Sequence, residues 1–168
     1  NHCDSSQMTS VLAAFRQMGG KIEELNGGTT LKVTPSEKYS PLHIETAPYP
    51  GFPTDMQAQI LTTLCLAEGR STVVESIFEN RFMHVAELQR LGAKIEVNGN
   101  VATIEGPVDF QGAPIMATDL RASACLVLAG LISKGTTRVS RIYHLDRGYQ
   151  RLDEKLCRLG AKITRVAE

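Results

Sequence analysis

The sequence has no excess of charge of either sign, because 18 Lys and Arg residues are balanced by 18 Asp and Glu residues. This balance argues against a protein that binds nucleic acid or a membrane surface, although a local basic patch stays open. Long apolar runs are lacking too. The longest, at residues 124–132, is well short of the ~18 residues that a membrane helix needs. No secretory signal pattern opens the chain.

Motifs for nucleotides, metals and disulfides are also lacking. There is no P-loop and no G-x-G-x-x-G, and the four histidines show no metal-ligand spacing, so we expect neither a metal nor a cofactor. The four cysteines (Cys3, Cys65, Cys125 and Cys157) form no C-x-x-C pair, and none has a His at catalytic spacing. Cys65 and Cys125 lie inside apolar helical runs. We therefore expect buried, reduced thiols in a cytoplasmic protein.

The chain repeats itself. Three segments share a pattern of helix, glycine and strand: VLAAFRQMGGKIEE, HVAELQRLGAKIEV and RLDEKLCRLGAKIT, which end at residues 24, 97 and 164. A glycine just after the last helical turn is the usual stop signal, and here it is Gly19, Gly92 and Gly160. Two further helices, each followed by a strand-like run, begin near Thr54 and Thr118.

One whole unit reads strand, helix, strand, helix, strand, strand. Residues 42–106 form nearly one unit, residues 111–168 form a second that lacks its final strand, and residues 1–34 are the end of a first. Because a single repeat cannot bury its own apolar face, the units should pack around a common axis. We expect residues 1–168 to form one domain, either cut from a longer protein or completed by outside strands.

The hydrophobic pattern predicts how the units pack. Residues 120–132 are apolar nearly all round, which is typical of a central buried helix. The strands at residues 94–97 and 101–104 instead alternate, which indicates sheets with one solvated face. The fold class is therefore α/β, an inside-out α/β barrel with helices inside and sheets outside.

Threefold packing would gather equivalent helix ends, and such ends are good anion sites. We expect helices to begin at Thr54–Asp55, Thr118–Asp119, Asn80–Arg81 and Asp146–Arg147. The pattern alone favours helix capping over catalysis for the two aspartates, with Thr54-x-x-Gln57 as a capping box and Asn80 and Asp146 as N-caps.

The arginines are harder to assign to capping. Arg81, Arg121 and Arg147 in first helical turns would oppose the helix dipole, so either an anion lies nearby or each charge is simply solvated. The pattern favours Phe78 and Tyr143 as core aromatics over a substrate platform. The proline-rich stretch before Asp55 either ends a strand or holds that carboxylate rigidly toward a ligand.

Four motifs, in order, resemble one family: PYPGFPTDMQAQ, IFENRFMHVAELQRLGA, MATDLRASA and IYHLDRGYQRLDEKLCRLGA. They resemble the UDP-N-acetylglucosamine enolpyruvyl transferases, which start bacterial peptidoglycan synthesis, and the similarity runs through the whole chain. The family fold has two domains, each of three repeats with helices inside. The resemblance implies that this chain is most of the second, C-terminal domain.

The resemblance also implies roles for individual residues. The family transfers the enolpyruvyl group of phosphoenolpyruvate to the 3′-hydroxyl of UDP-N-acetylglucosamine and releases phosphate, through a tetrahedral addition intermediate. It implies Asp55 as the general base, with Asp119 and Arg147 also in the catalytic set. The implied substrate contacts are Thr54, Asp55, Ile77, Phe78, Arg81, Arg121 and Arg147.

The chain lacks other parts of the family pattern. The N-terminal Lys-Asn pair, the mobile loop with a reactive cysteine and the whole first domain have no counterpart here. We therefore expect no turnover from the chain alone. The alternatives are part of the sibling enzyme that acts on shikimate 3-phosphate, which shares the fold and the phosphoenolpyruvate chemistry, or a binding module without catalysis.

Overall fold

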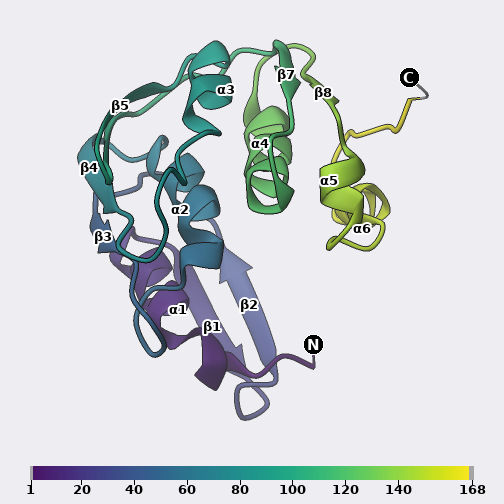
Figure 1. Ribbon diagram of the computed structural model, residues 1–168. Coiled ribbons are helices and arrows are strands. Elements are labelled where there is room, and N and C mark those ends of the chain that lie inside the picture. Colours follow the sequence, from purple (N-terminus) through teal and green to yellow (C-terminus); the bar gives the residue numbers. More distant parts are fainter. Residues whose placement is uncertain (1, 167–168) are drawn as a thin grey trace.

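The computed structural model describes residues 2–166 (Figure 1). Helices and strands alternate along most of the chain. In order, the elements are η1 (Ser5–Met8), α1 (Thr9–Gln17), β1 (Lys21–Leu25), β2 (Thr30–Thr34), β3 (His43–Glu45), η2 (Thr54–Met56), α2 (Gln57–Leu64), β4 (Gly69–Val74), α3 (Val85–Arg90), β5 (Lys94–Asn98), β6 (Val101–Gly106), β7 (Pro114–Met116), α4 (Leu120–Ile132), β8 (Arg138–Ser140), α5 (Tyr143–Asp146) and α6 (Leu152–Arg158).

The three repeated glycines end three helices in the same way. Gly19, Gly92 and Gly160 follow α1, α3 and α6 with φ angles of 101°, 99° and 95°, which lie in the left-handed region that favours glycine. After α1, the Gly19 amide donates to Arg16 O and the Gly20 amide to Phe15 O, both at 2.9 Å. The same pair of bonds follows α3 and α6. The predicted glycine stops are therefore confirmed as Schellman caps.

The second unit contains all six predicted elements. Its sheet has the order β3-β4-β6-β5, with β3 parallel to β4 and the other pairs antiparallel. In the described part of the third unit, to residue 166, the sheet is β7 parallel to β8, in matching register: Ile44 pairs with Val73 in the second unit, and Ile115 pairs with Val139 in the third. The first unit is represented by α1 and the β1–β2 hairpin.

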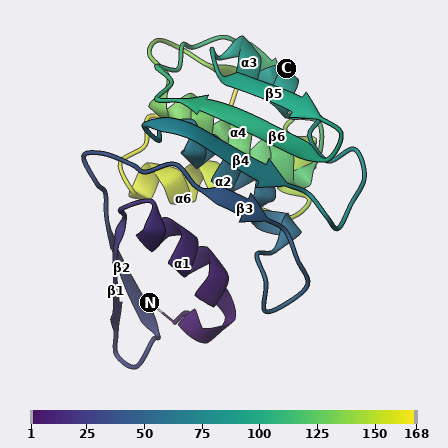
Figure 2. The ribbon, with the colours of Figure 1, turned by 90° about the vertical axis from the view of Figure 1, so that its left-hand side faces the viewer.

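Helices lie beneath the sheet. Figure 2 shows the four-stranded sheet across the front of α2 and α4. The buried side chains of the sheet, among them Val73, Ala102 and Ile104, belong to the core. The core joins α4 to α2, while the opposite side of α4 packs on Leu145 of α5. Leu128 and Ile132 of α4 are 39% and 46% exposed, so this central helix is not covered all round.

Three expectations about secondary structure are wrong. Asn80 and Arg81 lie in a turn before α3, and Asn80 has a left-handed φ of 54°. Asp146 ends α5 instead of capping a helix, and its carboxylate pairs with Arg165 at 2.8 Å. Residues 161–166 form no strand. In the second unit the equivalent strand, β5, has β6 as its neighbour, and no described residues supply that neighbour to the third unit.

A matched pair of substitutions in α4 tests the core. Leu126 is fully buried, so Leu126→Ala should lower the free energy of unfolding by about 2–5 kcal/mol through lost packing. Leu128→Ala, on the partly exposed side of the same helix, should cost less than about 1 kcal/mol. Urea denaturation followed by circular dichroism measures both. Equal losses would contradict the described position of α4.

Candidate active site

Asp55 lies in η2, directly before α2. Its Oδ1 accepts hydrogen bonds from Arg81 Nη2 at 3.2 Å and from Arg121 Nε at 2.9 Å. Arg121 Nη2 is also 2.9 Å from the same oxygen. Arg81 comes from the turn before α3 and Arg121 from the first turn of α4, so two repeat units meet at one carboxylate. The Asp55 side chain is 60% exposed, which leaves it accessible from solvent.

The two arginines differ in their surroundings. The Arg81 side chain is 18% exposed and that of Arg121 is 40% exposed. The Arg81 guanidinium carbon lies 4.6 Å from the centroid of the Phe78 ring, a cation–π geometry. For Arg121, whose charge opposes the dipole of α4, the expected nearby anion is Asp55. Two guanidinium groups against one carboxylate leave this trio with a net positive charge, which suits an anionic ligand.

Asp119 is the N-cap of α4. Its Oδ1 accepts hydrogen bonds from the backbone amides of Arg121 at 2.8 Å and Ala122 at 2.9 Å. The capping interpretation of Asp119 is therefore confirmed. The cap also fixes the first turn of α4, from which Arg121 reaches Asp55. A part for Asp119 in the reaction itself stays a prediction.

Glu75 is a site residue that the sequence analysis missed. It directly follows β4, is only 3% exposed, and accepts four hydrogen bonds. Its Oε2 accepts from Thr54 Oγ1 at 2.9 Å, and its Oε1 accepts from the amides of Ile77 at 3.0 Å and Phe78 at 3.1 Å. Thr46 Oγ1 is the fourth donor, at 2.9 Å. A signal was present, since a glutamate interrupts the apolar run STVVESIF.

Two expectations about individual side chains are wrong. The Thr54 hydroxyl donates to Glu75 and caps no helix, and Pro53 occupies the N-cap position of η2, so Thr54-x-x-Gln57 is not a capping box. Phe78 and Tyr143 are 54% and 53% exposed, so neither is a core aromatic. Phe78 lies in the turn after β4, and Tyr143 is the first residue of α5, after β8.

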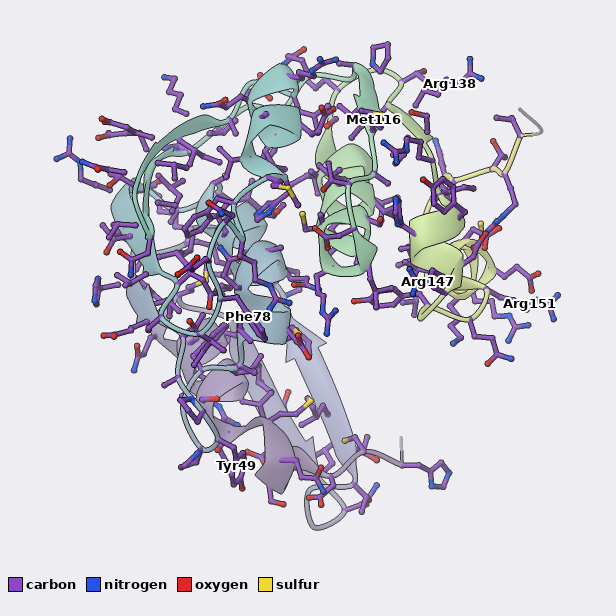
Figure 3. All side chains as sticks on the ribbon, viewed as in Figure 1. Tyr49, Phe78, Met116, Arg138, Arg147 and Arg151 are labelled. Atoms are coloured by element: carbon purple, nitrogen blue, oxygen red, sulfur yellow. The ribbon has the colours of Figure 1, made fainter. Side chains whose placement is uncertain are left out.

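Arg147 stands apart from this cluster. It follows α5, it is exposed, and Figure 3 shows it on the opposite side of α4 from Phe78. Tyr149, two residues further along the chain, nevertheless contacts α2: its Oη accepts a hydrogen bond from Gln59 Nε2 at 3.3 Å. With Glu75 as the link between Thr54 and the Ile77–Phe78 turn, contacts thus join Thr54, Asp55, Ile77, Phe78, Arg81, Arg121 and Asp119. None of the contacts described for residues 2–166 joins Arg147 to Asp55.

A cavity of ≈ 220 Å³ opens beside Arg81 and Phe78. Its lining residues are Glu75, Phe78, Glu79, Asn80, Arg81, Phe82, Gly99 and Asn100. Sites for ligands of drug size usually measure about 300–1,000 Å³, so this cavity offers only part of the volume that a sugar nucleotide needs. Among residues 2–166, no helix has the length and apolar character required to cross a bilayer.

His84 is buried beneath the cluster. It is 1% exposed, and burial lowers the pKa of its imidazole to about 4, while the negative charge of Asp119 opposes that shift. His84 is therefore neutral at neutral pH. Its Nε2 has no hydrogen-bond partner among the described residues.

Cys65 and Cys125 are buried free thiols, as expected, and burial raises the pKa of each to about 12. Thiols with such a pKa are poor nucleophiles at neutral pH. Cys3 is half-buried and Cys157 is exposed, so the expectation of burial fails for Cys157.

Comparison with known proteins identifies the family. Residues 1–156 match the family described as EPSP synthase (3-phosphoshikimate 1-carboxyvinyltransferase), and the chain belongs to this family of enolpyruvyl transferases. The UDP-N-acetylglucosamine 1-carboxyvinyltransferase of Anaeromyxobacter sp. (strain K) is 53% identical over 164 residues, which are 98% of this chain and 38% of that protein. The protein of the same name from Trichlorobacter lovleyi is 55% identical over 154 residues, or 92% of this chain and 37% of that protein.

Solved structures confirm the expected fold. The enolpyruvyl transferase NikO from Streptomyces tendae is similar with a TM-score of 0.88 and 30% identity, over 96% of this chain and 37% of NikO. EPSP synthase from Acinetobacter baumannii has a TM-score of 0.59 at 20% identity, over 83% of this chain and 34% of that one, which speaks for the fold alone. The chain thus spans well under half the length of the relatives it matches.

The burial of His84 predicts a pH dependence of stability. Between its ordinary pKa of 6.5 and the folded value of about 4, the unfolded chain binds a proton at His84 that the folded chain does not. The stabilisation is therefore complete above pH 6.5 and is lost as the pH falls toward 4, up to about 3 kcal/mol.

Urea denaturation of the chain and of His84→Gln, between about pH 7 and pH 5, measures this contribution. The variant should lose less stability than the parent as the pH falls. His43→Gln, at an exposed imidazole on β3, is the matched control and should keep the parent's slope. Parallel pH profiles for the parent and His84→Gln would contradict the prediction.

Proposed function

We propose that this chain is the C-terminal part of an enzyme that transfers the enolpyruvyl group of phosphoenolpyruvate to the 3′-hydroxyl of UDP-N-acetylglucosamine, with release of phosphate. Relatives of that name, at 53–55% identity over nearly the whole chain, support this choice of acceptor. The reaction would be the first committed step of peptidoglycan synthesis, in the bacterial cytoplasm, with cell division and cell shape depending on its product. The chain would form most of the second domain, and the first domain would be its partner.

The observation that carries the proposal is the meeting of Arg81 and Arg121 at Asp55 Oδ1. Phosphoenolpyruvate carries a carboxylate and a phosphate, and guanidinium groups bind both in bidentate fashion. Both arginines are held at the carboxylate that would take the proton, so an anionic substrate bound to them would lie within reach of Asp55. Such positioning supplies several kcal/mol of a reaction barrier.

The proposed reaction starts at the sugar hydroxyl. Asp55 removes the 3′-hydroxyl proton while the oxygen bonds to C2 of phosphoenolpyruvate and a general acid gives a proton to C3, which yields the tetrahedral intermediate. The C2–O bond to phosphate then breaks, phosphate leaves, and C3 gives a proton to a base. The C2=C3 double bond forms again, now as part of the enol ether product. Thr54 and the Ile77–Phe78 turn would contact the sugar nucleotide, and Asp119 would hold Arg121 in place. Exposed Arg147 would reach phosphoenolpyruvate when the two domains close.

The chain alone should show no turnover. Its cavity beside Arg81 is smaller than a sugar nucleotide requires, and closure against a second domain is needed to exclude water from the reacting groups. Phosphate release by the purified chain, measured with both substrates, should match the rate without protein. Phosphate release that depends on the sugar nucleotide would show that this domain is sufficient and would contradict the prediction.

Asp55→Asn in the complete enzyme tests the proposed base. Asn keeps the shape of the side chain but cannot accept a proton, so kcat should fall by about 10²–10⁴-fold, with little change in the melting temperature. Asp109→Asn, at an exposed aspartate paired with Lys134, is the matched control and should leave kcat unchanged. If melting falls in Asp55→Asn while activity is nearly kept, Asp55 has a structural role instead.

The description of the matching family names a different acceptor, shikimate 3-phosphate, which is therefore the second candidate. Titration of the complete enzyme with each acceptor, followed by calorimetry, separates the two. Binding heat with UDP-N-acetylglucosamine and none with shikimate 3-phosphate supports the proposal, and the reverse result refutes it. A module without catalysis would bind an acceptor but release no phosphate.

A further inference from the structure

Glu75, directly after β4, makes more hydrogen bonds than a solvent-exposed glutamate at the end of a strand would make. Its carboxylate accepts four hydrogen bonds while 3% of the residue is exposed. Its backbone is fixed as well, because its amide donates to Asn100 O at 2.8 Å and Asn100 Nδ2 donates to its carbonyl oxygen at 3.2 Å. Burying a carboxylate is costly unless it is fully hydrogen-bonded, and here the donors compensate for that cost.

Three of the four donors come from the two segments that carry the candidate site. Thr54, which donates to Oε2, is the residue before Asp55 in η2. The amides of Ile77 and Phe78, which donate to Oε1, belong to one turn, and the Phe78 ring of that turn lies against the Arg81 guanidinium. One side chain therefore ties the position of Asp55 to the position of the Phe78 turn.

The third unit shows that the fold itself does not require this carboxylate. Val74 ends β4 opposite Glu45, and Ser140 ends β8 opposite Met116 in the same register, so Arg141 occupies the position that corresponds to Glu75. Arg141 is exposed and its guanidinium donates to the Tyr143 hydroxyl at 2.8 Å. The equivalent strand pair, β7–β8, thus forms with an exposed cation, Arg141, at this position.

We propose that Glu75 is a positioning residue, which sets Asp55 for proton removal and the Ile77–Phe78 turn for sugar-nucleotide binding. The inference rests on the function proposed above. It assigns Glu75 no contact with substrate: the carboxylate acts through the Thr54 hydroxyl on one side and through two backbone amides on the other.

The experiment uses the complete enzyme that contains this chain. The variants are Glu75→Gln, which replaces one acceptor oxygen by a donor, Thr54→Val, which removes the hydroxyl, their double variant, and Thr54→Ser, which keeps the hydroxyl. Glu96→Gln, at an exposed glutamate of β5, is the matched control. Phosphate release gives kcat and the KM for the sugar nucleotide, and thermal denaturation reports the fold.

Displacement of Asp55 should lower kcat by about 10- to 100-fold in Glu75→Gln and Thr54→Val. The double variant should lose no more than the larger single loss, because both changes break the same link. Glu75→Gln should also raise the KM through the Phe78 turn, while Thr54→Ser should recover most of the activity. Glu96→Gln should behave as the unmodified enzyme.

Two results would overturn the inference: full kcat and KM in Glu75→Gln, or losses that multiply in the double variant. If Glu75→Gln does not fold, the Thr54 pair decides, since equal activity of Thr54→Val and Thr54→Ser would exclude the link. An unmodified enzyme without sugar-nucleotide-dependent phosphate release would refute the proposed function itself, and with it this role. Activity in the unmodified enzyme together with insensitive variants refutes only the role of Glu75.

Discussion

The packing of α2 against α4 is the contact on which the candidate site depends. Both helices are buried in the same core, through Leu61 and Leu64 on one side and Cys125 and Leu126 on the other. The η2 turn that leads into α2 and the first turn of α4 place Asp55 Oδ1 and Arg121 Nη2 2.9 Å apart. Because packed helices tolerate little relative movement, this distance is set by apolar side chains and not by the ion pair itself, which at such exposure contributes at most about 1 kcal/mol.

Local signals were enough to predict the frame of the fold. The Schellman glycines, the helix over the apolar run of α4 and the cap at Asp119 each depend on neighbours a few residues away, and each is confirmed. The resemblance to enolpyruvyl transferases implied roles for Asp55, Arg81, Arg121 and Arg147, and these roles stay predictions. The structure places Arg81 and Arg121 against Asp55, and none of the contacts described for residues 2–166 joins Arg147 to it.

The sequence could not predict features that depend on distant partners. Asp146 has the pattern of an N-cap, yet it pairs with Arg165, which follows α6 in the chain. Asn80–Arg81 has the pattern of a helix start, but both residues lie in a turn, where Asn80 has a left-handed φ and Arg81 pairs with Asp55. Glu75 looks like a solvated charge after a strand, because its four donors come from three separate segments of the chain.

The exposure of apolar side chains on α4 affects how this chain behaves in solution. Leu128 and Ile132 are partly exposed, and Leu159 is 84% exposed, while the net charge is zero and the isoelectric point is ≈ 7.1. Near neutral pH, therefore, almost no electrostatic repulsion keeps two molecules apart while their apolar surfaces attract. Colloidal stability should be lowest at the pH where most assays are run, and it should improve on either side of it.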